Sequence, residues 1–197
     1  MDSMTARGVT PRYEPFAPNV PPAILALWVF IAAEALFFGI LIASYLYLRV
    51  HVGMWPPPGY SQPDLLLPAV NTLVLLSSGF TMHGALACLR RGNVALLKDG
   101  IIATLLLGSA FLVGQAFEYA HAGFGLSDGL LGSSFYTLTG FHGAHVLGGL
   151  IFLAMVLGRA RRGHYTQERH LAVEAATLYW HFVDAVWIVL FTMLYLV

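Results

Sequence analysis

The sequence is poor in charged residues and in cysteine. Only 10% of its 197 residues are Asp, Glu, Lys or Arg, whereas a soluble domain carries roughly 25%. So few charges could not cover the water-facing surface of a soluble globular protein of this size, so that class is excluded. Intrinsic disorder is excluded too, because disordered chains are rich in charge and poor in hydrophobic residues. The single cysteine, Cys88, excludes an internal disulfide framework, a CxxC redox pair and a CxxCH haem-attachment site.

Motifs of self-contained enzymes are absent as well. The sequence has no Walker A loop, GxSxG elbow, zinc-protease motif or GxGxxG fingerprint. Its 10 basic and 10 acidic residues balance, so the net charge does not indicate a nucleic-acid partner. We therefore expect no catalytic residue and no bound nucleic acid in this chain.

Hydrophobic residues are abundant and occur in long runs. They make up 58% of the chain, and the mean hydropathy is +0.72. A hydrocarbon core roughly 30 Å thick needs about 20 apolar residues in a helix. Five stretches reach that length, approximately residues 23–48, 66–89, 100–120, 133–158 and 175–197. They predict an all-α polytopic membrane protein, a bundle of five transmembrane helices over residues 23–197. A polar tail, residues 1–22, precedes it, and we expect no signal peptide there.

Basic residues are distributed unequally between the two sides of this predicted bundle. Nine of the ten fall in the N-terminal tail or near the second and fourth connections, while the first connection has only Arg49 and the third has none. The nine are Arg7, Arg12, Arg90, Arg91, Lys98, Arg159, Arg161, Arg162 and Arg169. Because an excess of Lys and Arg in short loops marks the cytoplasmic side, we expect the N-terminus inside and the C-terminus outside.

One acidic residue, Glu34, lies near the middle of the first predicted span. A charged carboxylate exposed to lipid at that depth is costly, so the side chain should face protein or water, or be protonated. Two interpretations stay open. Glu34 is either a group that handles protons or contacts lipid, or a neutral structural acid held by an interhelical hydrogen bond.

Two motifs in the last two predicted spans carry further polar groups. TGFHGAHV places His142 and His145 three residues apart, and YWHFVD does the same for His181 and Asp184. Residues at this spacing share a helix face, and a rise of about 1.5 Å per residue puts all four near mid-membrane. We expect an intramembrane polar network between the two spans, with a metal or haem site formed by the imidazoles as the alternative. His83 stands alone, which favours a packed core residue.

Two further features concern packing. Glu118 lies near the outer end of the third predicted span, one turn before His121, where water lowers the cost of a carboxylate. An interfacial ion pair or subunit contact is therefore expected there. In the fourth predicted span, Gly140, Ala144 and Gly148 recur at four-residue intervals, which indicates close approach of another helix.

Taken together, these motifs resemble subunit III of the haem–copper oxidases, in its five-helix bacterial form. The matching stretches occur in the family's order and cover nearly all of the chain from the first predicted span onward. They are WVFIAAEALFFG, VNTLVLLSSG, GQAFEY, SDGLLGSSFYTLTGFHGAHVLGG and YWHFVDAVW. The mitochondrial form has two further spans ahead of these, and they form one arm of a cleft that holds phospholipid.

The resemblance implies a non-catalytic core subunit of a proton-pumping terminal oxidase in the bacterial cytoplasmic membrane. Such a subunit packs on subunit I in a complex with subunit II, and haem and copper are expected in those partners and none in this chain. The complex reduces oxygen with electrons from cytochrome c or quinol, and the WPPP loop favours cytochrome c. In this family, subunit III binds phospholipid, sustains proton uptake and protects the oxidase during turnover.

Individual residues match the family's pattern. Glu34 matches an intramembrane glutamate that reacts with carbodiimides, and Arg159 matches an arginine near lipid phosphate, which a guanidinium pairs with well. The resemblance implies only a structural role for the other matching polar residues, His142, His145, His181, Asp184 and Glu118.

Three alternatives to a cytochrome c oxidase subunit stay open. The chain could serve a quinol oxidase or another respiratory complex such as nitric oxide reductase. It could act alone as a proton channel or transporter, on the strength of Glu34 and the expected polar network. It could also be a b-type cytochrome with haem held by His142, His145 or His181.

Overall fold

The computed structural model of the protein describes residues 21–52 and 65–196. Five long helices cover most of them, namely α1 Pro22–His51, α2 Leu66–Arg90, α3 Val94–His121, α4 Gly129–Arg161 and α5 Leu171–Phe191. A short π-helix, η1 Thr192–Leu196, continues α5. Five spans, with α5 and η1 counted together, are long and apolar enough to cross a membrane, so the predicted all-α fold with five spans is confirmed. Most of the predicted N-terminal tail and the WPPP loop lie outside the described residues.

All five helices extend beyond the predicted apolar stretches, and α3, α4 and α5 do so by four residues or more at one end. Helix α3 begins at Val94 instead of residue 100, because the Asn93 side chain caps it by accepting a hydrogen bond from the Leu96 N–H (3.1 Å). Helix α4 starts four residues earlier and ends three later than predicted, and α5 starts four residues earlier. Hydropathy locates the part of a helix that lies in hydrocarbon, whereas backbone hydrogen bonding continues the helix into the polar interface.

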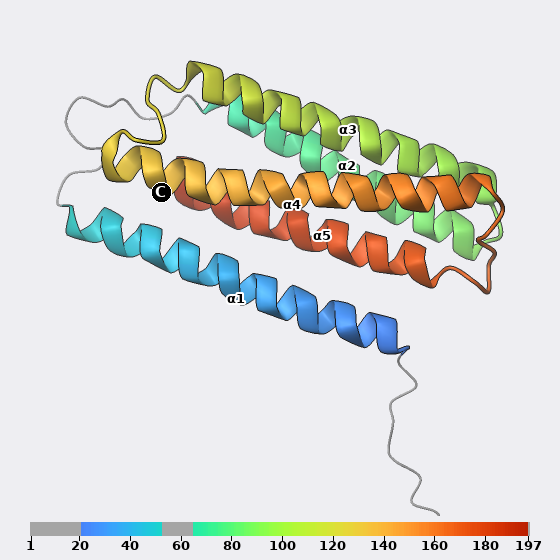
Figure 1. Ribbon diagram of the computed structural model, residues 1–197. Helices are drawn as coiled ribbons and strands as arrows, with labels where there is room; N and C mark the ends of the chain where they lie inside the picture. The colour runs from blue at the N-terminus through green and yellow to red at the C-terminus, as the bar shows by residue number, and fades with distance from the viewer. Residues whose placement is uncertain (1–20, 53–64, 197) are drawn as a thin grey trace, which may run out of the picture.

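Helices α2 to α5 pack as a four-helix bundle. Helix α2 lies against α3, α3 against α4, α4 against α5, and α5 against α2. Helix α1 lies outside this bundle, along α5 and α4 (Figure 1). In the most apolar part of α1 only 6% of the residues are buried, against 28–44% in the other four spans. Most of the core therefore lies in α2–α5, and α1 adds only Phe38 and Tyr45 to it from the outside.

Two tryptophans of α5 fill the centre of the bundle. Trp180 and Trp187 are both fully buried. Each indole Nε1–H donates to a hydroxyl of α2, Trp180 to Ser78 Oγ and Trp187 to Thr72 Oγ1, both at 2.9 Å. A buried indole N–H needs such a partner, so these bonds help to set the position of α5 against α2.

Glycines on α3 and α4 make room for the Trp180 indole. A Cβ at Gly108 or Gly149 would lie only 2.7–2.8 Å from carbon atoms of Trp180. The stripe singled out in the sequence has more space, because a Cβ at Gly148 would lie 3.6 Å from its nearest neighbour, and one at Gly140 would lie 4.0 Å away. The close approach of α4 to the Trp180 indole is therefore at Gly149, one residue away from the predicted stripe.

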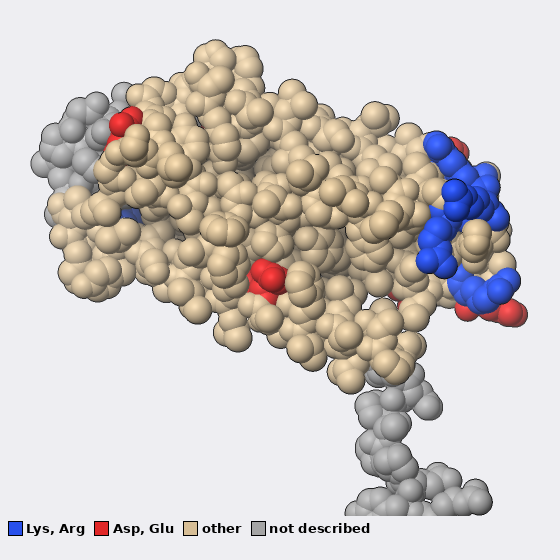
Figure 2. Space-filling view, viewed as in Figure 1, with Lys and Arg blue, Asp and Glu red and all other residues tan. Residues whose placement is uncertain are grey.

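Lys and Arg side chains gather at one end of the bundle, as Figure 2 shows. The α2–α3 and α4–α5 connections lie at this end, and α1 begins there (Figure 1). Arg90 at this end donates a hydrogen bond to Glu174 of α5 (2.7 Å). At the opposite end, Arg49 donates to the Tyr45 hydroxyl (3.1 Å) and to the Met193 carbonyl (3.4 Å). Among the described residues, the unequal distribution of basic residues in the sequence is thus also a separation in space.

Candidate functional site

An ion-pair contact joins α1 to the bundle near the middle of both helices. Glu34 Oε2 of α1 lies 3.0 Å from His145 Nε2 of α4. The two side chains are partly buried, with 23% of Glu34 and 17% of His145 exposed. The sequence pattern indicated that Glu34 should face protein or water, or be protonated, but it did not identify His145, since the two lie 111 residues apart.

The hydrogen bond of the other ring nitrogen, His145 Nδ1, fixes how many protons the Glu34–His145 contact contains. His145 Nδ1 lies 2.7 Å from the Phe141 carbonyl oxygen, and a carbonyl only accepts, so Nδ1 carries a hydrogen. The contact between Nε2 and Glu34 then contains one further proton. It is held either by a carboxylic acid that donates to a neutral ring or by an imidazolium that donates to a carboxylate. Both arrangements have zero net charge, so each costs less free energy within a membrane than an isolated charge would.

Aromatic groups of α1 and α5 surround the pair. The Phe38 ring packs edge-on against His145 with centroids 5.0 Å apart. Tyr179 of α5 donates its hydroxyl to the His145 backbone carbonyl (3.0 Å) and stacks on Phe30. The pair is therefore held by three helices and is open to the membrane side only in part. Chemically, the pair can hold one proton and pass it between Glu34 Oε2 and His145 Nε2.

His142, one turn earlier in α4, has a different environment. It is fully enclosed, with Nε2 3.2 Å from the Val183 carbonyl of α5 and its ring 4.8 Å from that of Trp187. Nε2 therefore carries the hydrogen, and the buried Nδ1 has no hydrogen-bond partner among the described residues. This geometry fits a neutral ring that fastens α4 to α5.

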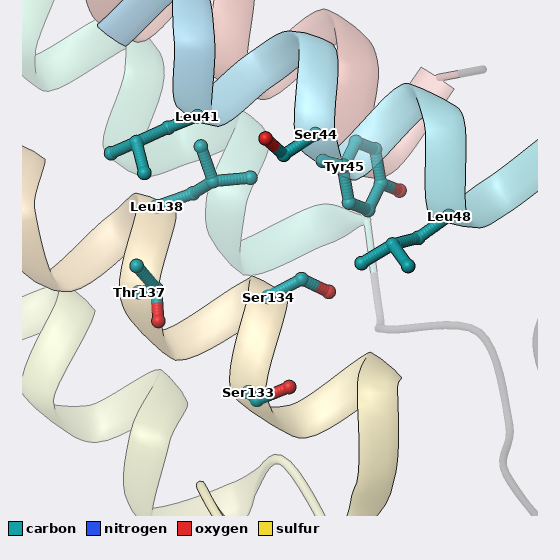
Figure 3. Close-up of a pocket in the computed structure, with 8 residues that line it drawn as sticks. All are labelled: Leu41, Ser44, Tyr45, Leu48, Ser133, Ser134, Thr137 and Leu138. Carbon is teal, nitrogen blue, oxygen red and sulfur yellow. The ribbon is translucent and has the colours of Figure 1, made fainter. Parts of the chain in front are cut away.

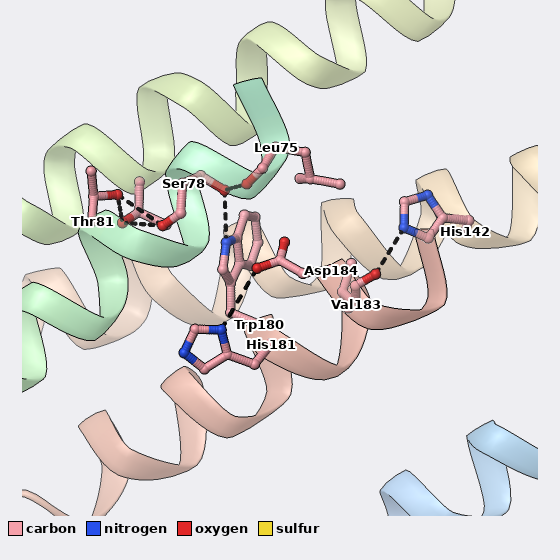
Figure 4. Close-up of polar contacts among 9 residues, drawn as sticks. Leu75, Ser78, Thr81, His142, Trp180, His181, Val183 and Asp184 are labelled. Carbon is pink, nitrogen blue, oxygen red and sulfur yellow. Dashed lines mark hydrogen bonds and ion pairs between the residues drawn. The ribbon is translucent and has the colours of Figure 1, made fainter. Parts of the chain in front are cut away.

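His181 and Asp184 lie on α5 beside α2 (Figure 4). His181 Nδ1 is 3.7 Å from Asp184 Oδ2, which is too long for a direct hydrogen bond. The carboxyl is almost fully buried, and its Oδ1 has no partner among the described residues. Gly79 of α2 leaves the space for it, because a Cβ there would collide with Oδ2.

The four polar groups expected to form one network thus make three separate contacts. His145 pairs with Glu34, His142 bonds to a backbone carbonyl, and His181 lies beside Asp184. Spacing along a helix predicts a shared face but not which neighbouring helix that face meets. In the described part of the chain, no three His, Cys, Asp or Glu side chains are grouped so that they could hold a metal ion.

Glu118 is buried near the end of α3 that faces away from the basic residues. Gln115 donates to its Oε2 (3.1 Å), and the Tyr195 hydroxyl donates to its Oε1 (2.6 Å). No Lys, Arg or His among the described residues forms an ion pair with it. The carboxyl therefore ties η1 to α3, a connection that the sequence did not reveal because Tyr195 lies 77 residues further on.

Arg159 lies in the last turn of α4 at the basic end, with an exposed side chain. In the following connection the Tyr165 side chain is buried. Burial raises the pKa of the Tyr165 phenol above its ordinary value, and the nearby Arg159 guanidinium lowers it in part. The guanidinium is accessible to an anionic group at this end of the bundle.

A groove of about 180 Å³ separates α1 from α4 at the end away from the basic residues (Figure 3). Three of its serine hydroxyls donate to carbonyls one turn earlier in their own helices, at 2.5–2.8 Å. With these donors occupied, the groove suits an apolar occupant. It is lined by Leu41, Ser44, Tyr45, Leu48, Ser133, Ser134, Thr137 and Leu138.

These features define the chain as a polytopic helical membrane protein whose polar sites form where helices meet. A model of the family described as cytochrome c oxidase subunit III matches residues 23–197. The chain therefore belongs to the cytochrome c oxidase subunit III family, and the resemblance in its motifs is confirmed.

Individual relatives agree with this assignment. A protein of Synechocystis sp. is 47% identical over 169 residues, which span 85% of this chain and 72% of that protein. One of Thermostichus vulcanus is 42% identical over 174 residues, spanning 88% and 86% of the two chains. One of Rattus norvegicus is 41% identical over 173 residues, spanning 85% and 66%. All three are named cytochrome c oxidase subunit 3.

Proposed function

We propose that this chain is the non-catalytic subunit III of a proton-pumping haem–copper oxidase that takes electrons from cytochrome c. It packs on subunit I in a complex with subunit II, and those partners hold the haem and copper while this chain holds no redox centre. Membership of the subunit III family and the names of the relatives support this assignment. A quinol oxidase remains the alternative, since the donor would dock on other subunits.

The proposed location is the bacterial cytoplasmic membrane, with the N-terminus inside and the C-terminus outside. The basic residues at one end of the bundle support this orientation (Figure 2). Arg159 at that end would pair with a lipid phosphate, and the groove between α1 and α4 would accept an acyl chain near the other end. Phospholipid is thus the expected ligand.

The Glu34–His145 pair carries the proposed role in sustaining proton uptake. Its hydrogen bonds require one exchangeable proton that either partner can hold. It is also accessible, because about a fifth of each side chain is exposed. When one partner takes up a proton as the other releases one, the pair passes a proton on at constant net charge and creates no isolated charge in hydrocarbon.

Glu34→Gln in the complete oxidase tests this role. The glutamine amide can still donate to His145 Nε2, so the contact is kept while the titrating group is lost. We expect normal assembly and normal haem content, but about a tenfold fall in the number of turnovers before activity is lost. Tyr179→Phe is the matched control, because it removes one hydrogen bond to the His145 carbonyl and leaves the titrating pair. Equal endurance of Glu34→Gln and wild type would show a purely structural role.

Two measurements separate the proposal from the other functions. The chain purified in mild detergent should bring haem-bearing partner subunits with it, and isolation without them would contradict the assignment. Liposomes that contain this chain alone should show no proton flux beyond that of empty liposomes. A flux that Glu34→Gln abolishes would favour an independent channel.

A further inference from the structure

A second polar surface of the bundle lies where α2 meets α5. His83 of α2 is exposed, and 42% of the His181 side chain on α5 is exposed. The centroids of the two rings are 6.0 Å apart. Within the described chain His83 makes no hydrogen bond, and the nearest carboxyl to His181, that of Asp184, is 3.7 Å away. Two adjacent imidazoles thus have unused donors and acceptors on the outside of the protein.

Both histidines lie at the depth of the hydrocarbon. His83 precedes Arg90, the last residue of α2, by seven residues, and His181 follows Leu171, the first residue of α5, by ten. At about 1.5 Å per residue these positions are about 10 Å and about 15 Å from the basic end. Hydrogen-bonding groups exposed to lipid at such depth are strongly unfavourable.

The outward faces of α1 and α3 are dominated by large apolar side chains. Leu106 and Val113 on the outside of α3 are 68% and 70% exposed, and Leu36 and Ile40 on α1 are 71% and 67% exposed. The surface with the two histidines therefore differs in chemistry from these faces. Its two exposed imidazoles need hydrogen-bonding partners, which a neighbouring molecule packed on this surface would supply.

The shape of α2 beside His83 suits a helix as this neighbouring molecule. Phe80, 80% exposed, projects from α2. Ser77 on one side of it is exposed, and Gly84 on the other side would have open space around an added Cβ. Small residues let a second helix approach closely, and an exposed aromatic ring between them can anchor in that helix's side chains.

We propose that the α2–α5 surface, made of Phe80, His83, Gly84 and His181, is covered by a transmembrane helix of another oxidase subunit. That helix carries an oxygen acceptor, from a carboxyl, amide or hydroxyl group, opposite the two imidazoles. The inference rests on the proposed function, because it needs a complex with other membrane subunits. It adds which surface of this chain meets the partner and what chemistry the partner presents there.

Photocrosslinking within the complete oxidase tests the surface. Phe80 is replaced by p-benzoylphenylalanine, and Leu106 on α3 receives the same replacement as a matched control. We expect an adduct with another oxidase subunit from position 80 and only lipid adducts from position 106. Lipid adducts alone from position 80, or an adduct with a second copy of this chain, would overturn the inference while haem-bearing subunits that still co-purify keep the proposed function intact. Absence of those subunits would instead overturn both.

A substitution at His83 tests whether a partner subunit hydrogen-bonds to this ring, because the retention of this chain in the oxidase should fall only in that case. Leucine is more favourable than histidine in lipid, so His83→Leu should leave retention unchanged or improve it if the surface faces lipid. If a partner bonds to the ring, detergent washing should release the variant from the oxidase about threefold or more faster. His83→Gln, which keeps a donor and an acceptor, should restore part of the retention. Unchanged or improved retention of His83→Leu would refute the hydrogen-bonding partner.

Discussion

Helix α1 and the bundle α2–α5 are equally able to cross a membrane but are held in different ways. The bundle has a continuous core in which two indoles, small residues and hydroxyls interlock. Helix α1 is the most hydropathic of the five spans, yet it is the least buried. Its attachments are few, chiefly the Glu34–His145 pair, the Phe37–Phe141 ring contact and the hydrogen bond from Tyr45 to the Met193 carbonyl.

This difference shows that hydropathy and packing are separate properties in a membrane protein. Lipid is as apolar as leucine, so an apolar helix gains little by packing against another. Tight association instead comes from shape and from hydrogen bonds. Substitutions in α2–α5 should therefore act through packing, whereas those in α1 should act through single polar contacts.

The largest contrast is expected between two tryptophans. Trp180→Ala removes a fully buried side chain and the indole N–H that donates to the Ser78 hydroxyl, which should destabilise the bundle by about 3–5 kcal/mol. Trp28→Ala on α1 removes a side chain that is 52% exposed and should change stability by less than about 1 kcal/mol. Thermal unfolding of the solubilised protein measures both, and equal effects would contradict the division into core and attached helix.

Two glycines should respond in opposite directions. Gly79→Ala on α2 places a methyl group against the Asp184 carboxyl, which should cost about 1–3 kcal/mol. Gly39→Ala on α1 meets nothing within 4 Å and should stabilise the helix by up to about 1 kcal/mol. The same unfolding measurement checks the pair of variants. A stabilising Gly79→Ala would mean that Asp184 moves aside at little cost.

The Glu34–His145 contact should couple α1 to α4 by about 0.6–2 kcal/mol. Cysteines at Leu41 and Leu138, which line the groove between these helices, report on their distance in a Cys88→Ser background. We expect Glu34→Leu or His145→Leu alone to lower the crosslinking yield, and the double variant to lower it no further. Additive losses would show that the two side chains act independently.

The smallest effects are expected from two tyrosines. Tyr45→Phe loses the hydroxyl that accepts from Arg49 and donates toward Met193, at a cost of about 0.5–1.5 kcal/mol. Tyr165→Phe removes a buried hydroxyl with no hydrogen-bond partner among the described residues, so stability at neutral pH should hardly change. Thermal unfolding at neutral pH distinguishes them.

The Tyr165 variant should also alter the response to alkaline pH. Burial raises the pKa of this phenol above its ordinary value of 10.0, so the folded state holds the proton more tightly than the unfolded state. The resulting stability is fully present below about pH 10 and is lost as pH rises through the raised pKa. Tyr165→Phe should show a smaller loss of stability above that pH than wild type, and an identical loss would assign the effect to other groups.

Much of the architecture could be predicted from the sequence. Five apolar runs gave the number of spans, and the unequal distribution of basic residues predicted a basic end that the structure also has among its described residues. The motifs around Glu34, His142 and His181 led to the subunit III family. The predicted helix ends were short by up to six residues because hydropathy does not detect caps such as Asn93.

The partners of the polar residues could not be predicted in the same way. His142 and His145 are three residues apart, yet one bonds to α5 and the other to α1. Glu118 accepts a hydrogen bond from Tyr195, a partner 77 residues further on that its position in the third predicted span did not indicate. A rotation of one helix by a single residue would change each of these partners without altering any apolar run.

The low charge content and the five apolar runs determined by themselves that this protein is embedded in a membrane and roughly where its helices lie. The cost of placing polar groups in hydrocarbon depends on each residue's own chemistry, and helices form through contacts within a few residues. Only the tertiary structure decided that α1 stands apart from the bundle, that Glu34 meets His145, and that His83 and His181 face outward together. Those outcomes depend on how surfaces far apart in the chain fit one another, and no local pattern encodes that fit.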